Sequence, residues 1–290
     1  MVVKRLSNGV ELPLVGLGTH GIDNEKLGEV IALAYSLGYR KFDTAWLYGN
    51  EQIIGAAIKK YSIPRSEVFL TSKLHIDNLY FKGYHNNIPN LKIRSVKSAF
   101  EASCKRLGTD YLDLYMIHWP FPKKESMWEE LERLYLEGRI RAIGVSSFLP
   151  SHIDELMLHA NLMPHVNQYE VTPINTLMSQ TTEFQRKGIH TEAYSLFGTT
   201  RNNENASVSI LGSEPILDIA TTHKKSPSQI ILRWAIQRGF SVIPRSKSLN
   251  HLKENLDIFD FILTEEEMQD INSMNQDKYS RWNPNIQYFK

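Results

Sequence analysis

Cysteine is almost absent from this sequence, and long hydrophobic runs are missing altogether. Of 290 residues only Cys104 is a cysteine, so no internal disulfide can form and a reducing compartment is expected. No apolar run approaches the roughly 20 residues that span a bilayer, and residues 1–6 lack the apolar core of a signal peptide. We therefore expect a cytoplasmic protein with no membrane partner.

An excess of charge of either sign is also absent. The chain carries 33 Lys plus Arg against 32 Asp plus Glu, spread along its length. Nucleic acids and anionic membranes attract proteins through clustered positive charge, so neither is expected as the main partner. Hydrophobic residues make up 42% of the chain, and a chain of this length buries roughly three quarters of its unfolded surface. These features predict a folded globular protein.

Short apolar, β-branched runs alternate with stretches of helical periodicity, which is typical of parallel strands joined by helices. The expected strand and helix pairs are 14–17 with 25–37, 41–43 with 51–61, 68–71 with 93–107, 112–117 with 127–137, 140–145 with 150–159, 165–168 with 174–187, 189–194 with 228–237, and 240–243 with 249–255. Eight such units in about 250 residues predict a closed (β/α)8 TIM barrel, whose reactive groups lie at the carboxyl ends of the strands.

Two further elements flank the repeating units. Residues 2–12 surround an Asn-Gly pair that readily adopts the positive φ values of a tight turn, so they predict an N-terminal β-hairpin. Residues 265–274 predict an extra C-terminal helix, opened by a capping box of Thr264 and Glu267. No Pro- or Ser-rich linker divides the chain, so residues 1–290 are expected to form one barrel domain.

One motif favours a different fold. Residues 16–21 match the G-x-G-x-x-G fingerprint of dinucleotide-binding domains, and Asp43 ends the next strand at the spacing of the ribose-binding acid. Alone, this pattern predicts a Rossmann-type dehydrogenase. However, Asp23 and Asn24 are typical of a helix cap, so the third glycine falls before the helix and not at its contact with the strand. The Rossmann fold therefore remains as an alternative to the barrel.

Four ionisable residues lie at or just beyond the expected ends of successive strands. Asp43 ends the second strand and Tyr48 lies in the loop beyond it, while Lys73 follows the third strand and His118 the fourth. Each alone has an ordinary structural explanation, such as a turn cap, a packed ring or a solvated charge. In a barrel, however, these strand ends meet on one side, so the four side chains should converge.

Together the four residues supply what the reduction of a carbonyl requires. A tyrosine phenol, with a pKa of about 10, can protonate the carbonyl oxygen while hydride reaches the carbon. Lys73 would stabilise the resulting phenolate, and Asp43 would hold the ammonium group in place. His118 would orient the carbonyl or share the proton. No zinc motif such as H-E-x-x-H occurs, and no metal is expected.

At these residues the chain resembles the aldo-keto reductases. The matching segments, in the family's order, are 16–19, 43–45, 48–51, 71–73, 107–114, 118–120, 144–146, 167–168 and 243–246. The resemblance implies a (β/α)8 fold that holds NADPH without a Rossmann domain. It also implies the reduction of aldehydes or ketones to alcohols by hydride transfer, with Tyr48 as general acid and Asp43, Lys73 and His118 completing a tetrad.

The resemblance further implies a set of cofactor-binding residues. Ser146 and Gln168 match positions that bind the nicotinamide carboxamide, and Tyr194 matches the aromatic residue that stacks on the ring. Arg245 and Ser246 match the site of the adenosine 2′-phosphate, where a guanidinium suits a doubly charged anion. The other implied cofactor positions are Thr19, Ser147, Glu254 and Asn255.

Several positions depart from the family pattern. Ser147 stands where the family usually has Asn, which puts one amide contact to nicotinamide in doubt. His251 stands where many members carry a second phosphate-binding Arg, although Lys247 adds a nearby charge. NADPH remains favoured over NADH. Leu196 and Phe197 replace the usual Pro-Leu of the family. This replacement puts in doubt whether the chain keeps the family's lid over the cofactor pyrophosphate.

Aromatic residues near the strand ends are candidates for the wall of a substrate pocket. They are Trp46 and Trp119, with Leu47 beside them and Trp282 near the end of the chain, and they suit apolar or aromatic carbonyl compounds. The connection 74–91 leaves a strand's carboxyl end and is longer than the family norm, so we expect it to border the same pocket. The physiological carbonyl substrate stays open, and a monomer is expected.

A second hypothesis is a barrel of the same family that has little catalytic role. A barrel of this kind can bind nucleotide chiefly to regulate a partner protein, and the presence of the four ionisable residues does not exclude this function. The sequence has no basic tail or obvious docking segment. We therefore take the reductase as the leading hypothesis and the regulatory barrel as its alternative.

Overall fold

The strands of this protein form a closed barrel. The computed structural model describes residues 1–75, 95–198, 210–280 and 283–284. Eight parallel strands follow one another in a single sheet, in the order β10-β9-β8-β7-β6-β5-β4-β3. Their bounds are β3 (Leu17–Gly18), β4 (Lys41–Asp43), β5 (Phe69–Leu74), β6 (Leu112–Ile117), β7 (Ile140–Ser146), β8 (Val166–Glu170), β9 (His190–Tyr194) and β10 (Ser241–Val242).

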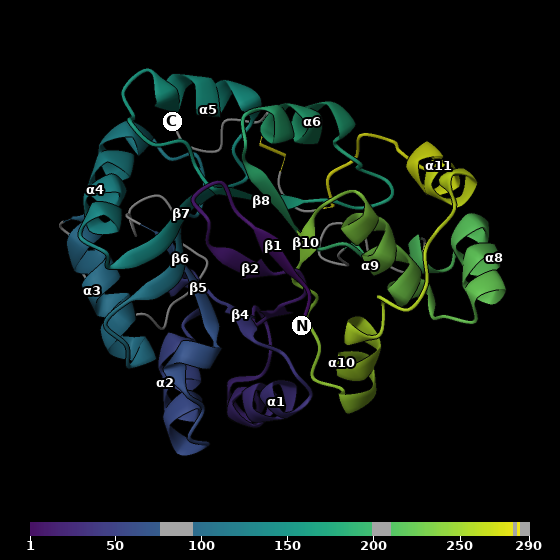
Figure 1. Ribbon diagram of the computed structural model, residues 1–290, viewed down its shortest axis with the longest axis horizontal. Helices are drawn as coiled ribbons and strands as arrows, with labels where there is room; N and C mark the ends of the chain where they lie inside the picture. The colour runs from purple at the N-terminus through teal and green to yellow at the C-terminus, as the bar shows by residue number, and fades with distance from the viewer. Residues whose placement is uncertain (76–94, 199–209, 281–282, 285–290) are drawn as a thin grey trace.

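The first and last strands meet at a parallel bridge between Val15 and Val242. The backbone N–H of Gly16 donates to the carbonyl of Val242 at 2.9 Å, and the N–H of Val242 donates to the carbonyl of Leu14 at 2.7 Å. These bonds join β3 to β10, so the predicted (β/α)8 barrel is confirmed. Figure 1 shows the helices as a ring around the strands.

The glycines of the G-x-G-x-x-G segment serve this closure. A Cβ at Gly16 would lie 2.9 Å from the Cγ and Cδ atoms of Lys41, and a Cβ at Gly18 would lie 2.7 Å from the carbonyl oxygen of Ile243. Asp23 caps the following helix by accepting a hydrogen bond from the N–H of Glu25 at 3.1 Å. The Rossmann alternative is therefore wrong, because the glycines make room for the chain's own side chain and backbone.

Helices link the strands and cover the outside of the barrel. Their bounds are α1 (Asn24–Ser36), α2 (Glu51–Lys60), α3 (Val96–Leu107), α4 (Lys124–Leu136), α5 (Pro150–Met157), α6 (Met178–Arg186), α8 (Glu214–His223), α9 (Pro227–Gln237), α10 (Leu249–Leu256) and α11 (Glu265–Ser273). Helix α11 carries the predicted capping box of Thr264 and Glu267. No helix in the described part of the chain has the length and apolar character needed to cross a bilayer.

Helix α8 was not predicted from the sequence and lies between the predicted strand 189–194 and the predicted helix 228–237. The helix buries Ile216, Ile219 and Ala220. Its last turns contain Thr221 and Thr222, whose hydroxyls donate back to the carbonyls of the preceding turn at 2.9 and 3.0 Å. β-Branched residues lower helix propensity, so the apolar spacing here was too weak a signal.

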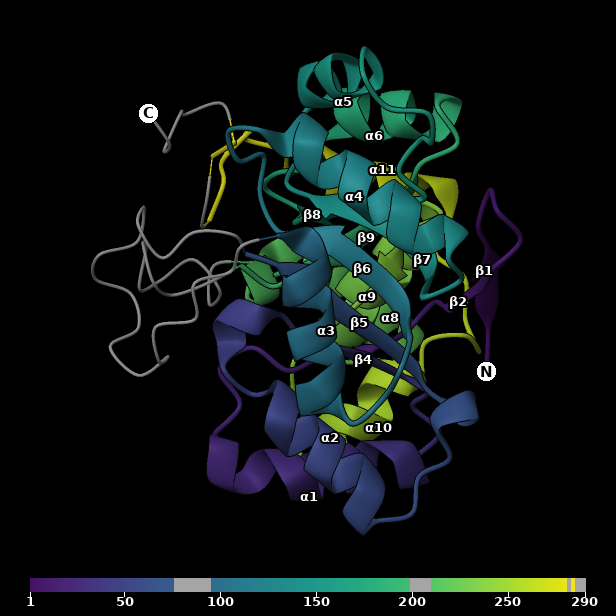
Figure 2. The same ribbon diagram turned by 90° about the vertical axis from the view of Figure 1, so that its left-hand side faces the viewer.

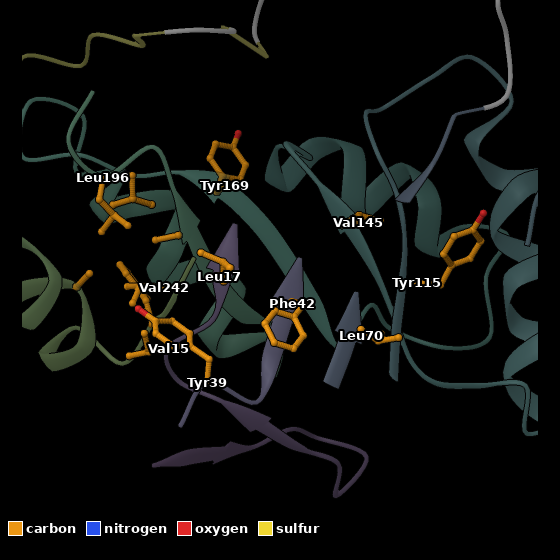
Figure 3. Packing of buried hydrophobic residues seen from close by; sticks show 14 of the residues in the cluster. Val15, Leu17, Tyr39, Phe42, Leu70, Tyr115, Val145, Tyr169, Leu196 and Val242 are labelled. Atoms are coloured by element: carbon orange, nitrogen blue, oxygen red, sulfur yellow. The ribbon is translucent and has the colours of Figure 1, made fainter. Parts of the chain in front are cut away.

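Alternation along the strands separates the core from the interior of the barrel. On β4, Phe42 faces outward and shares one buried cluster with Leu27 of α1 and Ile54 of α2, while Lys41 and Asp43 face inward. Figure 3 shows the same outer layer at Leu17, Phe42 and Leu70 on successive strands. The larger hydrophobic cluster therefore lies between barrel and helices, and the inner face of β4 carries charged groups.

The predicted hairpin closes the amino end of the barrel. Strands β1 (Val3–Arg5) and β2 (Glu11–Pro13) pair antiparallel, and the Asn8 side chain donates to the carbonyl of Arg141 at 2.9 Å. Leu6 and Leu12 are buried with residues from β5 to β8 in a second apolar cluster. The hairpin crosses the centre of Figure 1 and lies at one end of the barrel in Figure 2. The hairpin and this cluster therefore close the amino end of the barrel.

Candidate active site

A buried ion pair lies at the carboxyl end of the barrel. The ammonium group of Lys73, on β5, lies 2.6 Å from Oδ1 of Asp43, at the end of β4, and it also donates to the carbonyl of Thr44 at 2.9 Å. The two side chains are 0% and 2% exposed. Burial lowers the pKa of Lys73, and the Asp43 carboxylate partly offsets this shift by favouring the charged form.

Tyr48 lies directly above this pair. It belongs to a single 3-10 turn, Trp46–Tyr48, that follows β4. The Lys73 ammonium is 5.2 Å from the centre of the Tyr48 ring. The turn is fixed by Asn50, which accepts a hydrogen bond from the Thr44 hydroxyl at 2.5 Å and donates to the carbonyl of Thr19 at 3.2 Å. Phenol, ammonium and carboxylate thus meet as the sequence analysis predicted.

His118 completes the group at the end of β6. Its ring lies edge-on to Tyr48, with centroids 5.8 Å apart, and stacks on Trp119 at 4.2 Å. Burial lowers the pKa of His118 well below its ordinary value, and the positive charge of Lys73 adds to that effect. The imidazole is therefore neutral near pH 7, and it can donate one N–H without carrying charge.

Gln168 connects this group to the barrel interior. Its amide nitrogen Nε2 donates to Oδ2 of Asp43 at 2.8 Å and to Oε1 of Glu192 at 2.9 Å. Ser146, on β7, is in register with Gln168 on β8. Ser147 has the left-handed φ of 59°, and its hydroxyl lies 3.1 Å from that of Tyr194. The residues predicted for the nicotinamide end therefore lie together around Gln168.

The residues predicted for the phosphate end lie between β10 and α10. Arg245 is exposed, and its guanidinium donates to the carbonyls of His20 and Gly21 at 3.4 and 3.5 Å. Ser246 is buried and accepts a hydrogen bond from the N–H of Ser248, the residue that precedes α10. A guanidinium next to a helix amino terminus forms a donor set that suits a phosphate group.

Three other predicted cofactor positions have structural contacts of their own. Thr19 is buried and donates to the carbonyl of Asp43 at 2.8 Å. Glu254, on α10, accepts from the Ser226 hydroxyl at 3.5 Å, and Asn255 is buried on the same helix. These contacts leave any role of the three residues in binding adenine or ribose as a prediction.

Comparison with known proteins decides the family. The model of the aldo/keto reductase family matches residues 14–276. The chain belongs to the aldo-keto reductase family. It is 39% identical to a glyoxal reductase of Bacillus subtilis, over 97% of this chain and 95% of that protein. It is also 39% identical to a 9,11-endoperoxide prostaglandin H2 reductase of Trypanosoma cruzi, over 94% and 91% of the two chains.

Solved structures of other aldo-keto reductases superimpose closely on this one. The enzyme of Brucella melitensis has a TM-score of 0.82 at 36% identity, with 94% of this chain and 99% of that chain covered. A variant of Gox0644 in complex with NADPH has a TM-score of 0.84 at 34% identity, with 98% and 97% covered. An aldo-keto reductase of Bombyx mori in complex with NADP has a TM-score of 0.82 at 28% identity, with 97% and 94% covered. The protein is thus an oxidoreductase of a family whose members bind NADPH.

Aromatic and imidazole rings form the wall beside Tyr48 in this reductase. Trp46 is buried and stacks on His75, with ring centroids 5.5 Å apart. The His75 ring in turn lies edge-on to Phe121 at 5.2 Å and to Trp119 at 5.9 Å. These four residues are referred to below as the aromatic wall. The two tryptophans are the residues that the sequence suggested for the wall of a substrate pocket, and that role stays a prediction.

Sequence reasoning missed the other ring residues near Tyr48. His75 follows Lys73 by two residues, so strand alternation places both on one face, and this signal was available. His20, whose ring lies 4.7 Å from that of Tyr48, is part of the misleading glycine motif. Leu47 is half-buried in the turn that carries Tyr48. Predicted contributions from Trp282 and from most of the 74–91 connection lie outside the described residues.

Proposed function

We propose that this reductase converts aldehydes or ketones to alcohols with NADPH, and that Tyr48 is the general acid. The observation that carries the proposal is the position of the Lys73 ammonium, paired with Asp43 and 5.2 Å from the Tyr48 ring. A phenol donates a proton readily only if its anion is stabilised, and a buried cation beside the ring provides that stabilisation.

Each residue of the group has one task in this reaction. When bound, NADPH supplies the hydride that the carbonyl carbon receives. Tyr48 donates its hydroxyl proton to the carbonyl oxygen, and Lys73 stabilises the negative charge that develops on the phenol oxygen. Asp43 keeps Lys73 charged in its buried position. The neutral imidazole of His118 donates a hydrogen bond that orients the carbonyl.

The residues present also suit the dinucleotide. Gln168 would offer a carbonyl oxygen to the nicotinamide carboxamide, because its amide nitrogen is engaged by two carboxylates. Ser146 and Ser147 would add contacts to the same group, and Tyr194 would stack on the ring. Arg245 would bind the 2′-phosphate at the amino end of α10. The complexes of Gox0644 and of the Bombyx mori enzyme with NADPH and NADP support this choice of cofactor.

The aromatic wall supports apolar or aromatic carbonyl substrates. Planar rings such as Trp46 and Trp119 bind flat apolar groups well and tolerate several shapes. The names of the Bacillus subtilis and Trypanosoma cruzi relatives indicate a dicarbonyl and a lipid endoperoxide as their substrates. A substrate panel should therefore include aromatic aldehydes, dicarbonyls and bulky ketones.

The test is NADPH consumption over such a panel, with wild-type protein and the Tyr48→Phe variant. We expect turnover by the wild type and a loss of roughly 10²- to 10⁴-fold in kcat for the variant, because the general acid is removed. NADPH binding, followed by its fluorescence, should stay close to normal. Retained turnover in the variant would reject Tyr48 as the acid. No NADPH oxidation with any carbonyl would instead favour a regulatory nucleotide-binding barrel.

The choice of NADPH over NADH depends on Arg245 in this proposal. Replacing Arg245 by Leu should weaken NADPH binding by about 10- to 100-fold, since charge-assisted hydrogen bonds contribute about 1.5–3 kcal/mol. NADH binding should change little, because NADH has no 2′-phosphate. Exposed Arg186 on α6 provides a control, since its replacement by Leu should alter neither affinity. Equal losses for both cofactors in the Arg245 variant would contradict this assignment.

A further inference from the structure

A second buried lysine–carboxylate pair lies one layer below the first. Lys41, on β4 two residues before Asp43, contacts the carboxylate of Glu192 on β9, and both side chains are 0% exposed. The two strands are not neighbours in the sheet, so the pair spans the inside of the barrel. Gly16 leaves the space through which the Lys41 side chain passes. No step of the proposed proton transfer uses this pair.

Glu192 is held on both of its oxygens. Oε1 accepts a hydrogen bond from the amide nitrogen of Gln168 at 2.9 Å, and Oε2 accepts one from the Ser241 hydroxyl at 3.0 Å. The three residues are in register on β8, β9 and β10. Lys41 supplies the positive charge that allows a carboxylate to be buried there. The Glu192 carboxylate is therefore fixed in position next to Gln168.

This arrangement determines which way the Gln168 amide points. An amide –NH2 group has two protons, and here one goes to Asp43 and the other to Glu192. Ionised carboxylates only accept hydrogen bonds, so the carbonyl oxygen of Gln168 cannot take the place of its nitrogen. A ligand that reaches Gln168 meets an acceptor and no donor.

We propose that the Lys41–Glu192 pair is a positioning element that fixes the Gln168 amide with its carbonyl oxygen towards the cofactor. The inference rests on the proposed function, in which this oxygen accepts a hydrogen bond from the –NH2 of the nicotinamide carboxamide. Without Glu192, one of the two amide protons of Gln168 has no acceptor, and the amide can rotate. Neither Lys41 nor Glu192 needs to touch substrate or cofactor for this effect.

The inference predicts a specific preference among cofactor analogues. The acetylpyridine analogue of NADP⁺ carries a methyl ketone in place of the carboxamide, so it has an acceptor but no N–H. A fixed acceptor on Gln168 should make the wild type bind NADP⁺ about three- to tenfold more tightly than this analogue, as expected for one neutral hydrogen bond. Equilibrium binding, measured by quenching of tryptophan fluorescence, gives the ratio of the two affinities without any turnover.

Paired substitutions test the role of the buried pair. Lys41→Met/Glu192→Leu removes both charges together and leaves neither buried alone. We expect the affinity ratio to fall towards one in this variant. In the matched variant Lys41→Met/Glu192→Gln, the new carbonyl oxygen can still accept from Gln168, so most of the preference for NADP⁺ should return. This rescue distinguishes positioning of the amide from a general effect of altering the barrel.

Two further variants make the test independent of folding problems. Asp113→Asn changes a carboxylate on β6 that is also buried and paired, at 2.8 Å from Arg65, but whose partners are Arg65, Arg141 and Leu70 and not Gln168; it should keep the wild-type ratio. Glu192→Asp keeps the charge opposite Lys41 but withdraws the acceptor by one methylene, so the ratio should fall even if the leucine variant does not fold. An unchanged ratio in Glu192→Asp, or in the leucine variant, would overturn the inference.

Failure of the inference can be separated from failure of the proposed function. If the wild type oxidises NADPH with carbonyl substrates but the affinity ratio is the same in every variant, the reductase stands and the positioning role is wrong. If the variants change the affinity ratio as expected but no carbonyl is reduced, the proposed reaction is wrong while the role of the pair stands.

Discussion

Lys73 with Asp43 and Lys41 with Glu192 are the same two chemical groups in the same barrel, and both pairs are shut off from solvent. Burial lowers the pKa of both ammonium groups. A perturbed pKa is often used to find catalytic residues, and here it would select both lysines. The phenol of Tyr48 lies beside the upper pair, whereas Gln168 and Ser241 hydrogen-bond to the carboxylate of the lower pair. The comparison shows that burial and pKa identify a buried pair, whereas its neighbours decide what the pair does.

The two pairs are not independent of each other. Gln168 donates to one carboxylate of each pair, at 2.8 Å to Asp43 and at 2.9 Å to Glu192. The proposals made above assign proton transfer to the upper pair and orientation of the Gln168 amide to the lower pair. Substitutions that separate these two roles are the most direct tests.

The largest difference should appear in turnover. Lys73→Met should lower kcat by roughly 10²- to 10⁴-fold, because the phenolate of Tyr48 loses the cation that stabilises it. Lys41→Met should lower kcat by less than about tenfold, since one weakened neutral hydrogen bond is at stake. Both values come from initial rates at saturating NADPH and substrate. Equal losses in the two variants would remove the distinction between the pairs.

Stability should respond in the same way at both pairs. Each single lysine variant leaves a buried carboxylate without its partner, so we expect a loss of about 3–5 kcal/mol in the free energy of unfolding. Replacing both members by apolar residues, as in Lys41→Met/Glu192→Leu or Lys73→Met/Asp43→Leu, should restore most of this loss. Urea unfolding of the single and double variants measures these changes in the free energy of unfolding. Restored turnover in the upper double variant would contradict a catalytic role for that pair.

The smallest effect, counted per pH unit, is on the pH dependence of stability and arises at His190, which lies beneath the lower pair. His190 is buried against Ser241, 3.0 Å from its hydroxyl, and burial lowers the pKa of His190 to about 3. The unfolded chain binds a proton at this residue near pH 6.5 and the folded chain does not, so the free energy of unfolding falls as the pH drops from about 6.5 to about 3. One proton corresponds to a slope of at most about 1.4 kcal/mol per pH unit.

His190→Asn should remove the contribution of His190 to the slope of the unfolding free energy against pH. Urea unfolding at a series of pH values from neutral downward would detect this change. The exposed His159→Asn is the control and should leave the slope unchanged. An identical slope in wild type and His190→Asn would show that the burial of this imidazole has no thermodynamic consequence.

The regular elements could be predicted because hydrophobic periodicity is local. Strands 41–43 and 112–117 have the predicted bounds in the structure. Strand β5 was predicted to end at Thr71, but it continues to Leu74. Its last residues include Ser72 and Lys73, and polar residues in a run are usually taken as a loop. The strand ends that carry the chemistry are therefore the least regular part of the pattern.

The upper pair could be predicted and the lower pair could not. Asp43 and Lys73 lie at the ends of consecutive strands, which a parallel barrel must bring together. Lys41 and Glu192 lie within strands that are far apart in the sequence and not adjacent in the sheet. Their contact depends on the closed barrel and on the space at Gly16, neither of which a local pattern contains.

The hairpin has a consequence for the order in which cofactor and substrate would bind and leave. In the described residues, Leu6, Leu12 and the cluster around them fill the barrel at its amino end. Ligands would therefore enter and leave at the carboxyl end, where Tyr48 lies. Gln168 is 2% exposed and lies deeper than the phenol. In the proposed function, a dinucleotide that contacts Gln168 would therefore have to bind before the carbonyl compound, and the alcohol would have to leave before the oxidised dinucleotide. A barrel with one accessible end favours such a compulsory order.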